Sequence, residues 1–234
     1  GIFAIAIGTV LLPTLSKLDL KNEKIKFIQS VHKGQRFVIF IAVPSLIGLF
    51  FCAEDLISTI FYRGAFTQID VLNSSYSLMA FSFGLPFFML MKVLTPAFFA
   101  RKDTKTPMYV AMVSLLLNAS LNYYLAFMLD FGHIGIALGS SIAALISVLI
   151  LEFILYKDGF IKIKSVFNRF NIMILFSSLS LILFLNFYTN LTNFIEFSQV
   201  ERLLYLSIEV IISIIIYGAV SRLILRKPIQ TLFE

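Results

Sequence analysis

Long apolar stretches, separated by short polar connections, run through the whole sequence. A helix needs about 20 apolar residues to cross the roughly 30 Å hydrocarbon core of a membrane, because it rises about 1.5 Å per residue. In residues 142–151 Ser147 is the only polar residue, so a helix there has almost no polar face. The pattern predicts seven spans, the first truncated: residues 1–12, 37–53, 76–100, 108–129, 134–156, 171–188 and 203–225. The predicted fold class is all-α, a polytopic bundle of transmembrane helices.

The composition supports lipid as the surrounding medium. Of the 234 residues 59% are hydrophobic and 14% are charged, whereas soluble proteins have roughly 45–50% apolar and about 25% charged residues. The single cysteine, Cys52, excludes an intrachain disulfide and is expected to be a buried, inert thiol. The histidines, His32 and His133, lie in predicted loops, and zinc or haem sites of the familiar kinds lack their ligands. No cofactor is expected.

Basic residues alternate from one connection to the next. Connections 17–36, 101–107 and 157–170 and the C-terminal tail carry nearly all of the 19 Lys and Arg residues, whereas the opposite connections carry only Arg63 and Arg202. Because Lys and Arg accumulate on the cytoplasmic side, the C-terminus is expected in the cytoplasm and Gly1 near the outer face. Anionic phospholipids are the expected partners of these charges, and nucleic acid is not, because the charges are spread over every inner connection.

Connection 17–36 has a helical pattern of its own. Ile25, Ile28 and Val31 recur at helical spacing between lysines, which indicates a short helix lying on the cytoplasmic surface of the membrane. A solvated linker is the alternative interpretation.

Segment 76–100 carries the residues that most disturb a helix. Gly84 and Pro86 lie near its middle and Pro96 lies toward its inner end, so bends are expected there, as at Pro44 in the preceding span. Bent helices are common in transporters.

Lys92 lies in the same segment, about two turns from its basic boundary. An ammonium group in hydrocarbon needs a partner or a water-filled cavity, and a lysine in a cavity would suit a phosphate-bearing substrate as a point charge. Alternatively, its stem extends so that the charge reaches the inner headgroups.

Several other polar residues lie within predicted spans. Asn118 and Asn122, four residues apart, share one helix face that could bind a cation or hydrogen-bond neighbouring helices. Gly135, Gly139 and the serines after it indicate close helix packing. Glu209 could couple to protons, or it could reach the outer interface or stay protonated.

Three stretches, in this order, resemble the MurJ (MviN) family of lipid II flippases, within the superfamily of multidrug, oligosaccharidyl-lipid and polysaccharide exporters. They are G-T-V-L-L-P-T-L-S-K at 8–17, F-Y-R-G-A-F-T at 61–67 with Asp70 nearby, and K-V-L-T-P-A-F-F-A-R-K-D-T-K-T-P at 92–107. The resemblance covers essentially the whole chain. It implies the eighth to fourteenth helices of a fourteen-helix protein, so the chain is expected to begin inside a longer protein whose N-terminal lobe is absent here.

The resemblance implies two units and a transport mechanism. Residues 1–156 would form the C-terminal transporter lobe, with an amphipathic linker at 17–36, and residues 157–234 two additional helices and a cytoplasmic tail. The lobes would rock around a cationic cavity that receives the pyrophosphate and sugar of lipid II and moves it to the outer leaflet of the bacterial cytoplasmic membrane. The last two helices would guide the undecaprenyl tail. Such a protein is a transporter and not an enzyme.

The resemblance also carries over to individual residues. Lys92 is the candidate headgroup-binding residue, and Arg63, Gly64 and Phe66 match the outer-loop motif, with Arg63 a second candidate for substrate binding. Pro86, Pro96 and the turn from Asp103 to Pro107 are candidate structural positions, the turn matching an inner hinge region.

Some family members are similar to sodium-coupled exporters with an Asn and an Asp four residues apart and a hydroxyl residue in the next helix. The corresponding residues here are Asn118, Asn122 and Ser140, so Asn122 replaces the acid. Coupling to the membrane potential, to H⁺ or to Na⁺ stays open.

Other functions compete with lipid II transport. An O-antigen or capsular polysaccharide flippase, or a related multidrug exporter, would share the topology. A glycosyl- or acyltransferase would need carboxylates or a histidine at a membrane face, where Glu54 and Asp55 are the nearest approach to such a pair. A structural membrane subunit is the alternative of another class.

Overall fold

The computed structural model describes residues 2–161, 169–191 and 197–225. Over these residues every regular element is a helix, which confirms the predicted all-α class. The helices are α1 (Ile2–Ser16), α2 (Lys24–Phe51), α3 (Ala53–Phe61), α4 (Gln68–Ser82), α5 (Leu85–Ala100), α6 (Lys105–Tyr123), the π-helical turn η1 (Tyr124–Met128), α7 (Gly132–Lys157), α8 (Arg169–Leu191) and α9 (Gln199–Leu225). Six helical stretches in this part of the chain are long and apolar enough to cross a membrane, with α4 and α5 together making one of them.

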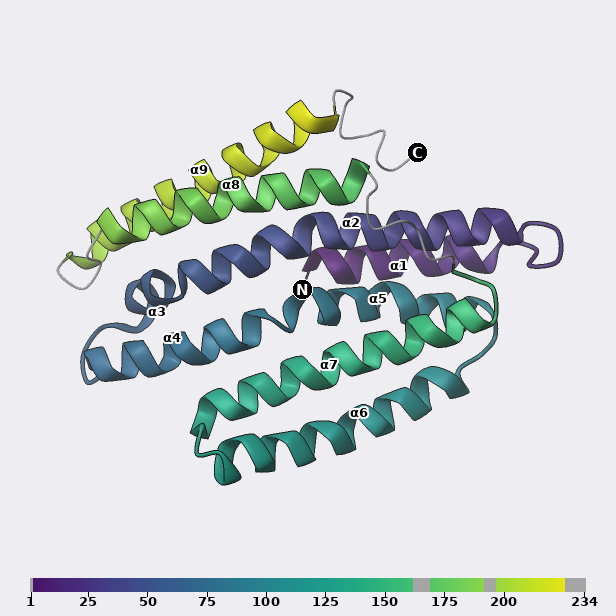
Figure 1. The fold of residues 1–234 in the computed structure, drawn as a ribbon, viewed down its shortest axis with the longest axis horizontal. Helices are drawn as coiled ribbons and strands as arrows, with labels where there is room; N and C mark the ends of the chain where they lie inside the picture. The colour runs from purple at the N-terminus through teal and green to yellow at the C-terminus, as the bar shows by residue number, and fades with distance from the viewer. Residues whose placement is uncertain (1, 162–168, 192–196, 226–234) are drawn as a thin grey trace.

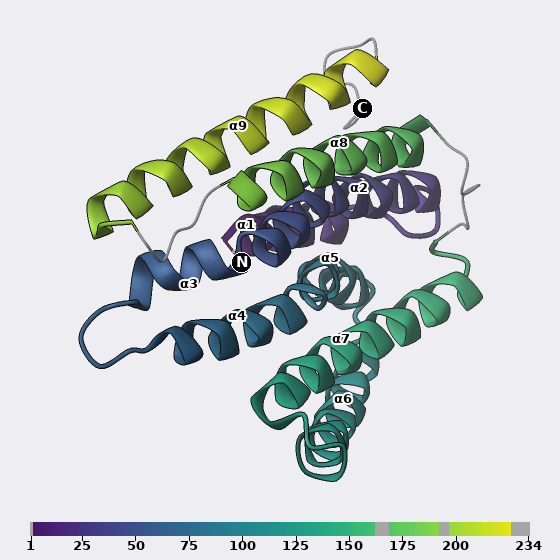
Figure 2. The same ribbon diagram turned by 60° about the vertical axis from the view of Figure 1, so that its left-hand side comes forward.

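The helices form three neighbouring groups. Figure 1 shows α1, α2 and α5 in the middle, the hairpin of α6 and α7 on one side, and the pair α8 and α9 on the other. Figure 2 shows the same order after a turn of 60°. Completely buried side chains from α1, α2, α5 and α7, including Leu15, Phe27, Phe98 and Leu155, join the middle group to α7.

The predicted short surface helix is part of α2, and that prediction is wrong. Lys24–Phe51 is a single helix of 28 residues. Ile28 and Val31 are buried in it, whereas Ile25 is 70% exposed. Their helical spacing therefore reflects packing inside the bundle. His32 also lies in α2, with Nδ1 3.1 Å from Gln35 Oε1, so its assignment to a loop is wrong.

The predicted bend near the middle of segment 76–100 is present. α4 ends at Ser82 and α5 begins at Leu85, with Pro86 in the first turn, where a missing N–H costs no helical hydrogen bond. A Cβ at Gly84 would lie 2.7 Å from Ser141 Oγ, so the glycine lets the break approach α7 closely. α2 and α5 continue through Pro44 and Pro96 respectively.

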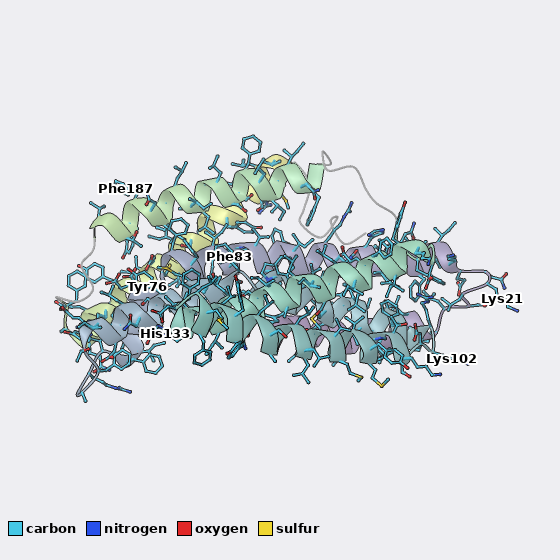
Figure 3. All side chains as sticks on the ribbon, turned by 60° about the horizontal axis from the view of Figure 1, so that its bottom comes forward. Lys21, Tyr76, Phe83, Lys102, His133 and Phe187 are labelled. Carbon is cyan, nitrogen blue, oxygen red and sulfur yellow. The ribbon has the colours of Figure 1, made fainter. Side chains whose placement is uncertain are left out.

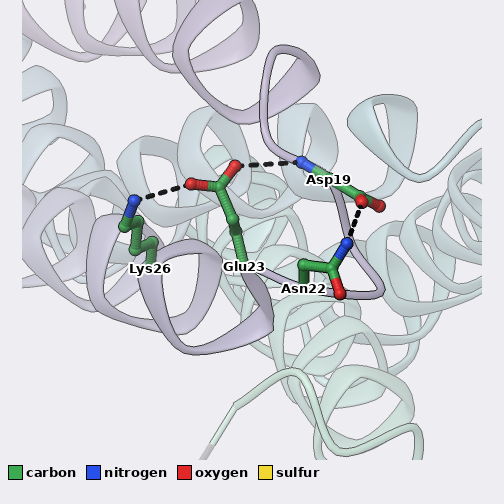
Figure 4. Close-up of polar contacts among 4 residues, drawn as sticks. All are labelled: Asp19, Asn22, Glu23 and Lys26. Carbon is green, nitrogen blue, oxygen red and sulfur yellow. Dashed lines mark hydrogen bonds and ion pairs between the residues drawn. The ribbon is translucent and has the colours of Figure 1, made fainter.

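Three connections meet at one end of the bundle, which we call the basic end: residues 17–23 and 101–104, which carry Lys and Arg, and residues 158–161. Figure 3 shows Lys21 and Lys102 at this end and His133 toward the other, which we call the opposite end. In the first connection Asn22 Nδ2 donates to Asp19 Oδ2 over 2.7 Å, and the Asp19 amide donates to Glu23 (Figure 4). Lys26 pairs with Glu23 at 2.6 Å and thereby lowers the pKa of that carboxyl. The basic residues at 162–168 and beyond 225 lie outside the described residues.

Candidate functional site

Lys92 lies on α5 with its backbone packed and its side chain exposed. Val93 and Leu94, which follow it, are completely buried in the core. On the packed side, a Cβ at Gly8 of α1 would lie 2.7 Å from the carbonyl oxygen of Lys92. Two of the three motif stretches therefore meet here, and their contact fixes the backbone from which the lysine extends.

The loop of residues 62–67 joins α3 to α4 at the opposite end and holds the second motif. Gly64 has φ +61°, a left-handed conformation that favours glycine. Thr67 and Asp70 form a capping box at the start of α4, with the Thr67 amide donating to Asp70 Oδ2 over 2.8 Å. The residues of the motif thus form a turn followed by a helix cap, which gives Asp70 a structural role.

An open pocket lies on this loop. It is lined by Tyr62, Arg63, Gly64, Phe66, Thr67, Gln68 and Ile69. The ring of Phe66 lies 5.9 Å from that of Phe61, and the Arg63 side chain is exposed. The loop therefore presents a guanidinium beside an aromatic surface.

The structure does not bring Lys92 and Arg63 together. α4, which rises about 22 Å, and the first half of α5 separate them along the chain. The two candidate residues for binding substrate therefore lie in different parts of the structure.

The candidate cation cluster is brought together between α6 and α7. Asn118 Nδ2 donates to Ser140 Oγ over 3.0 Å, and the Asn122 amide lies 3.0 Å from Asn118 Oδ1. When the Asn122 amide is turned over, its nitrogen reaches the backbone carbonyls of Asn118 and Ile136 at 3.2 and 3.1 Å. Gly139 leaves room for this amide, because a Cβ there would overlap it. In either orientation the polar groups bond across the two helices.

The turn between α5 and α6 is fixed by Asp103. Its Oδ1 accepts from the Thr106 amide over 3.0 Å, and this bond holds the pKa of the Asp103 carboxyl below its usual value. Pro107 is buried in the first turn of α6, where proline is well tolerated. Both residues thus have structural roles at the basic end.

A cluster around Phe160 at the basic end was not predicted from the sequence. Lys24 Nζ lies 4.4 Å and Arg101 Cζ 4.1 Å from the centroid of the Phe160 ring. Arg101 also pairs with Asp158 at 2.6 Å. A hydrogen bond that was also not predicted joins α2 to α7, where Gln35 Nε2 donates to Glu152 over 2.8 Å.

Glu209 and Cys52 meet at the opposite end. Glu209 is completely buried and accepts from the Cys52 thiol over 3.1 Å, so the interpretation that its carboxyl reaches the outer interface is wrong. Cys52 is buried, as expected. Arg202 is buried as well, with 6% of its surface exposed.

The comparisons with known proteins agree with this geometry. The family model described as Lipid II flippase MurJ matches residues 1–216. The chain is 38% identical over 159 residues to a probable lipid II flippase MurJ of Vibrio cholerae, covering 68% of this chain and 30% of that protein. It is 35% identical over 153 residues to the lipid II flippase MurJ of Thermosipho africanus, covering 65% of this chain and 31% of that protein. The chain thus spans about a third of the length of these relatives.

A solved structure gives the same result. A lipid II flippase MurJ in an inward closed conformation matches 97% of this chain and 44% of that chain, with a TM-score of 0.76 and 29% identity. The order of the helices, the three motifs and both comparisons lead to one conclusion: the chain belongs to the MurJ family.

Proposed function

We propose that this chain is the C-terminal part of a flippase that moves lipid II, or a closely related polyprenyl-pyrophosphate-linked sugar, across the bacterial cytoplasmic membrane. One observation carries the proposal: 97% of the chain superposes on a lipid II flippase with a TM-score of 0.76. The physical need is clear, because a multiply charged headgroup cannot cross hydrocarbon unaided without a large free-energy cost.

Within this proposal Lys92 binds the pyrophosphate. Its side chain is exposed on the lobe while its backbone is packed against Gly8, so the charge is presented from a rigid position. In the whole protein the N-terminal lobe would cover this face and form the cavity. Arg63 would meet the headgroup at the opposite end, where the loop of residues 62–67 is open.

The basic end faces the cytoplasm in this proposal, and the opposite end faces outward. The Lys and Arg residues of connections 17–23 and 101–104 lie at the basic end, where the headgroups of anionic phospholipids would contact them. Cysteines placed at positions 21, 63 and 102 of the full-length protein test this orientation with an impermeant thiol reagent in intact cells. Labelling of position 63 alone is expected, and labelling of position 21 or 102 would overturn the assignment.

Transport is proposed to be coupled to the membrane potential or to H⁺, and not to Na⁺ bound at Asn118, Asn122 and Ser140. The donors and acceptors of these residues bond to one another, and no carboxylate lies among them. Neutral amides compensate a cation less well than an acid does.

Replacement of the resident flippase tests the function. The complete gene is expressed in a bacterium depleted of its own lipid II flippase, and growth is expected to resume. Absence of growth, with the protein present in the membrane, would overturn the proposal. Purified protein in vesicles then distinguishes substrates, since faster flipping of an O-antigen or capsule precursor than of lipid II would favour the other class of flippase.

A further inference from the structure

Helix α9 contacts the short helix α3 at both ends through two charged side chains on one face. Arg202 and Glu209 are seven residues apart on α9, which is two turns or about 10 Å. The first lies at the C-terminal end of α3, and the second lies at its N-terminal end, so the two helices run antiparallel at this contact.

Arg202 hydrogen-bonds to backbone carbonyl groups at the C-terminal end of α3. Its Nη1 donates to the carbonyl oxygens of Ser58 and Tyr62, each over 3.3 Å. The guanidinium carbon lies 4.7 Å from the centroid of the Tyr62 ring. The Ser58 carbonyl also accepts from the Tyr62 amide. Carbonyls at the C-terminal end of a helix carry partial negative charge, so a buried cation is well placed there.

Glu209 occupies the other end of α3. It accepts from the thiol of Cys52, the residue that precedes the first turn of α3. An acidic group near a helix N-terminus complements the partial positive charge there. Asp55 lies close by, and its burial, with the charges of Glu209 and Glu54, raises the pKa of Asp55 to about 8.

Apolar packing supports the same contact. Cys52, which precedes α3, and Leu56 of α3 lie in one cluster with Leu185 of α8 and Tyr217 of α9. The polar bonds at the two ends of α3 and this apolar packing therefore fix both the position and the direction of α3.

The contact between α9 and α3 extends to the loop of residues 62–67. Tyr62, whose carbonyl and ring both contact Arg202, lines the pocket and directly precedes Arg63. We propose that Arg202 and Glu209 are positioning residues through which α9 sets the place of this loop and of Arg63. The role of the loop in transport rests on the proposed function, whereas the contact itself does not.

Cys52 is the test probe, because it is the single cysteine of this chain and is buried by the contact. The full-length protein, with any cysteine elsewhere replaced, is reconstituted in vesicles and treated with N-ethylmaleimide. Arg202→Met is expected to raise the rate of Cys52 alkylation at least tenfold. Arg222→Met is the matched control, since Arg222 is an exposed arginine toward the other end of α9, and it is expected to leave the rate unchanged.

Equal alkylation rates in the two variants would overturn the positioning role. If Arg202→Met does not fold, Arg202→Lys serves instead, because it keeps the positive charge and loses the planar guanidinium group. An increase of two- to fivefold in the rate of Cys52 alkylation is then expected. Glu209→Gln keeps an acceptor for the thiol and is expected to alkylate at no more than twice the wild-type rate, whereas Glu209→Ala is expected to match Arg202→Met. A Glu209→Ala rate equal to the wild-type rate would also contradict the proposal.

Flipping rates separate this proposal from the proposed function. If α9 acts through Arg63, the double variant Arg63→Ala with Arg202→Met loses no more activity than the more impaired single variant. Losses that multiply would overturn the link between the two arginines. A wild-type rate for Arg63→Ala would count against the proposed role of Arg63, while the alkylation result would still decide whether Arg202 holds α3.

Discussion

Gly8 of α1 lies directly against the backbone of Lys92 on α5, and a Cβ at position 8 would be 2.7 Å from the lysine carbonyl oxygen. The atom in the way is backbone, which cannot turn aside as a flexible side chain can. The place of the candidate headgroup lysine therefore depends on a glycine 84 positions earlier in the chain.

Gly8→Ala is expected to destabilise the full-length protein by about 1–3 kcal/mol, because the helices must separate to admit the methyl group. Gly48→Ala is the control, since nothing lies within 4 Å of a Cβ there and alanine favours a helix. Thermal unfolding in detergent measures both. Equal unfolding temperatures would mean that α1 and α5 are not held together at Gly8.

Lys92→Met is expected to slow flipping by roughly tenfold or more, because a hydrogen bond to a charged group contributes about 1.5–3 kcal/mol. Lys92→Arg keeps the charge and should restore most of the rate. Lys105→Met removes an exposed lysine at the start of α6 and serves as the control. Unfolding temperatures should stay within a degree or two in all three variants, and wild-type flipping by Lys92→Met would exclude this lysine from substrate binding.

Phe160→Leu is expected to lower the free energy of unfolding by about 1–3 kcal/mol, since it removes two cation–π contacts and an edge contact with Phe27. Phe160→Tyr keeps the ring and should behave like the wild type. Chemical denaturation in detergent gives both values. An equal loss of unfolding free energy in the tyrosine variant would show that the contacts of the aromatic ring do not cause the destabilisation.

Asp103 should give one part of the stability a dependence on pH. Because its pKa is lowered in the folded protein, its contribution is present above the ordinary aspartate pKa of about 3.9 and is lost as the pH falls through the lowered value. The unfolding temperatures of the wild type and of Asp103→Ala should therefore converge below about pH 4. A difference that stays constant down to pH 2 would contradict the hydrogen bond to Thr106.

Asn122→Asp should create sensitivity to sodium. The carboxylate would lie beside Asn118, whose amide bonds to Ser140, and would add a negative charge to this cluster. Replacing K⁺ by Na⁺ is then expected to raise the unfolding temperature of the variant and to leave that of the wild type unchanged. Stabilisation of the wild type by Na⁺ would contradict coupling to the potential or to H⁺ alone.

The spans were predictable from the sequence, because an apolar run of about 20 residues has few outcomes other than a membrane helix. The boundary of α2 was not. Ile28 and Val31 give the same spacing whether they face lipid or protein, and the side chains that bury them come from elsewhere in the chain. The break at Gly84 and Pro86 was predictable, since both residues act on the local backbone.

The polar contacts were predictable only where they are local. The four-residue spacing of Asn118 and Asn122 placed them on one face, and the structure joins them to Ser140. Arg101 and Asp158 are 57 residues apart, and Arg202 and Tyr62 are 140 apart. No periodicity connects such positions, so these pairs are known only from the fold.

The continuity of α2 through Pro44 joins the basic end of the bundle to the start of α3 by a single helix. Its 28 residues extend about 42 Å, some 12 Å more than the hydrocarbon is thick, and the hydrogen bonds of Asp19, Asn22 and Glu23 close its tip. A spin label or fluorophore at Lys21, in the connection that leads into α2, would therefore report movement of the basic end during a transport cycle.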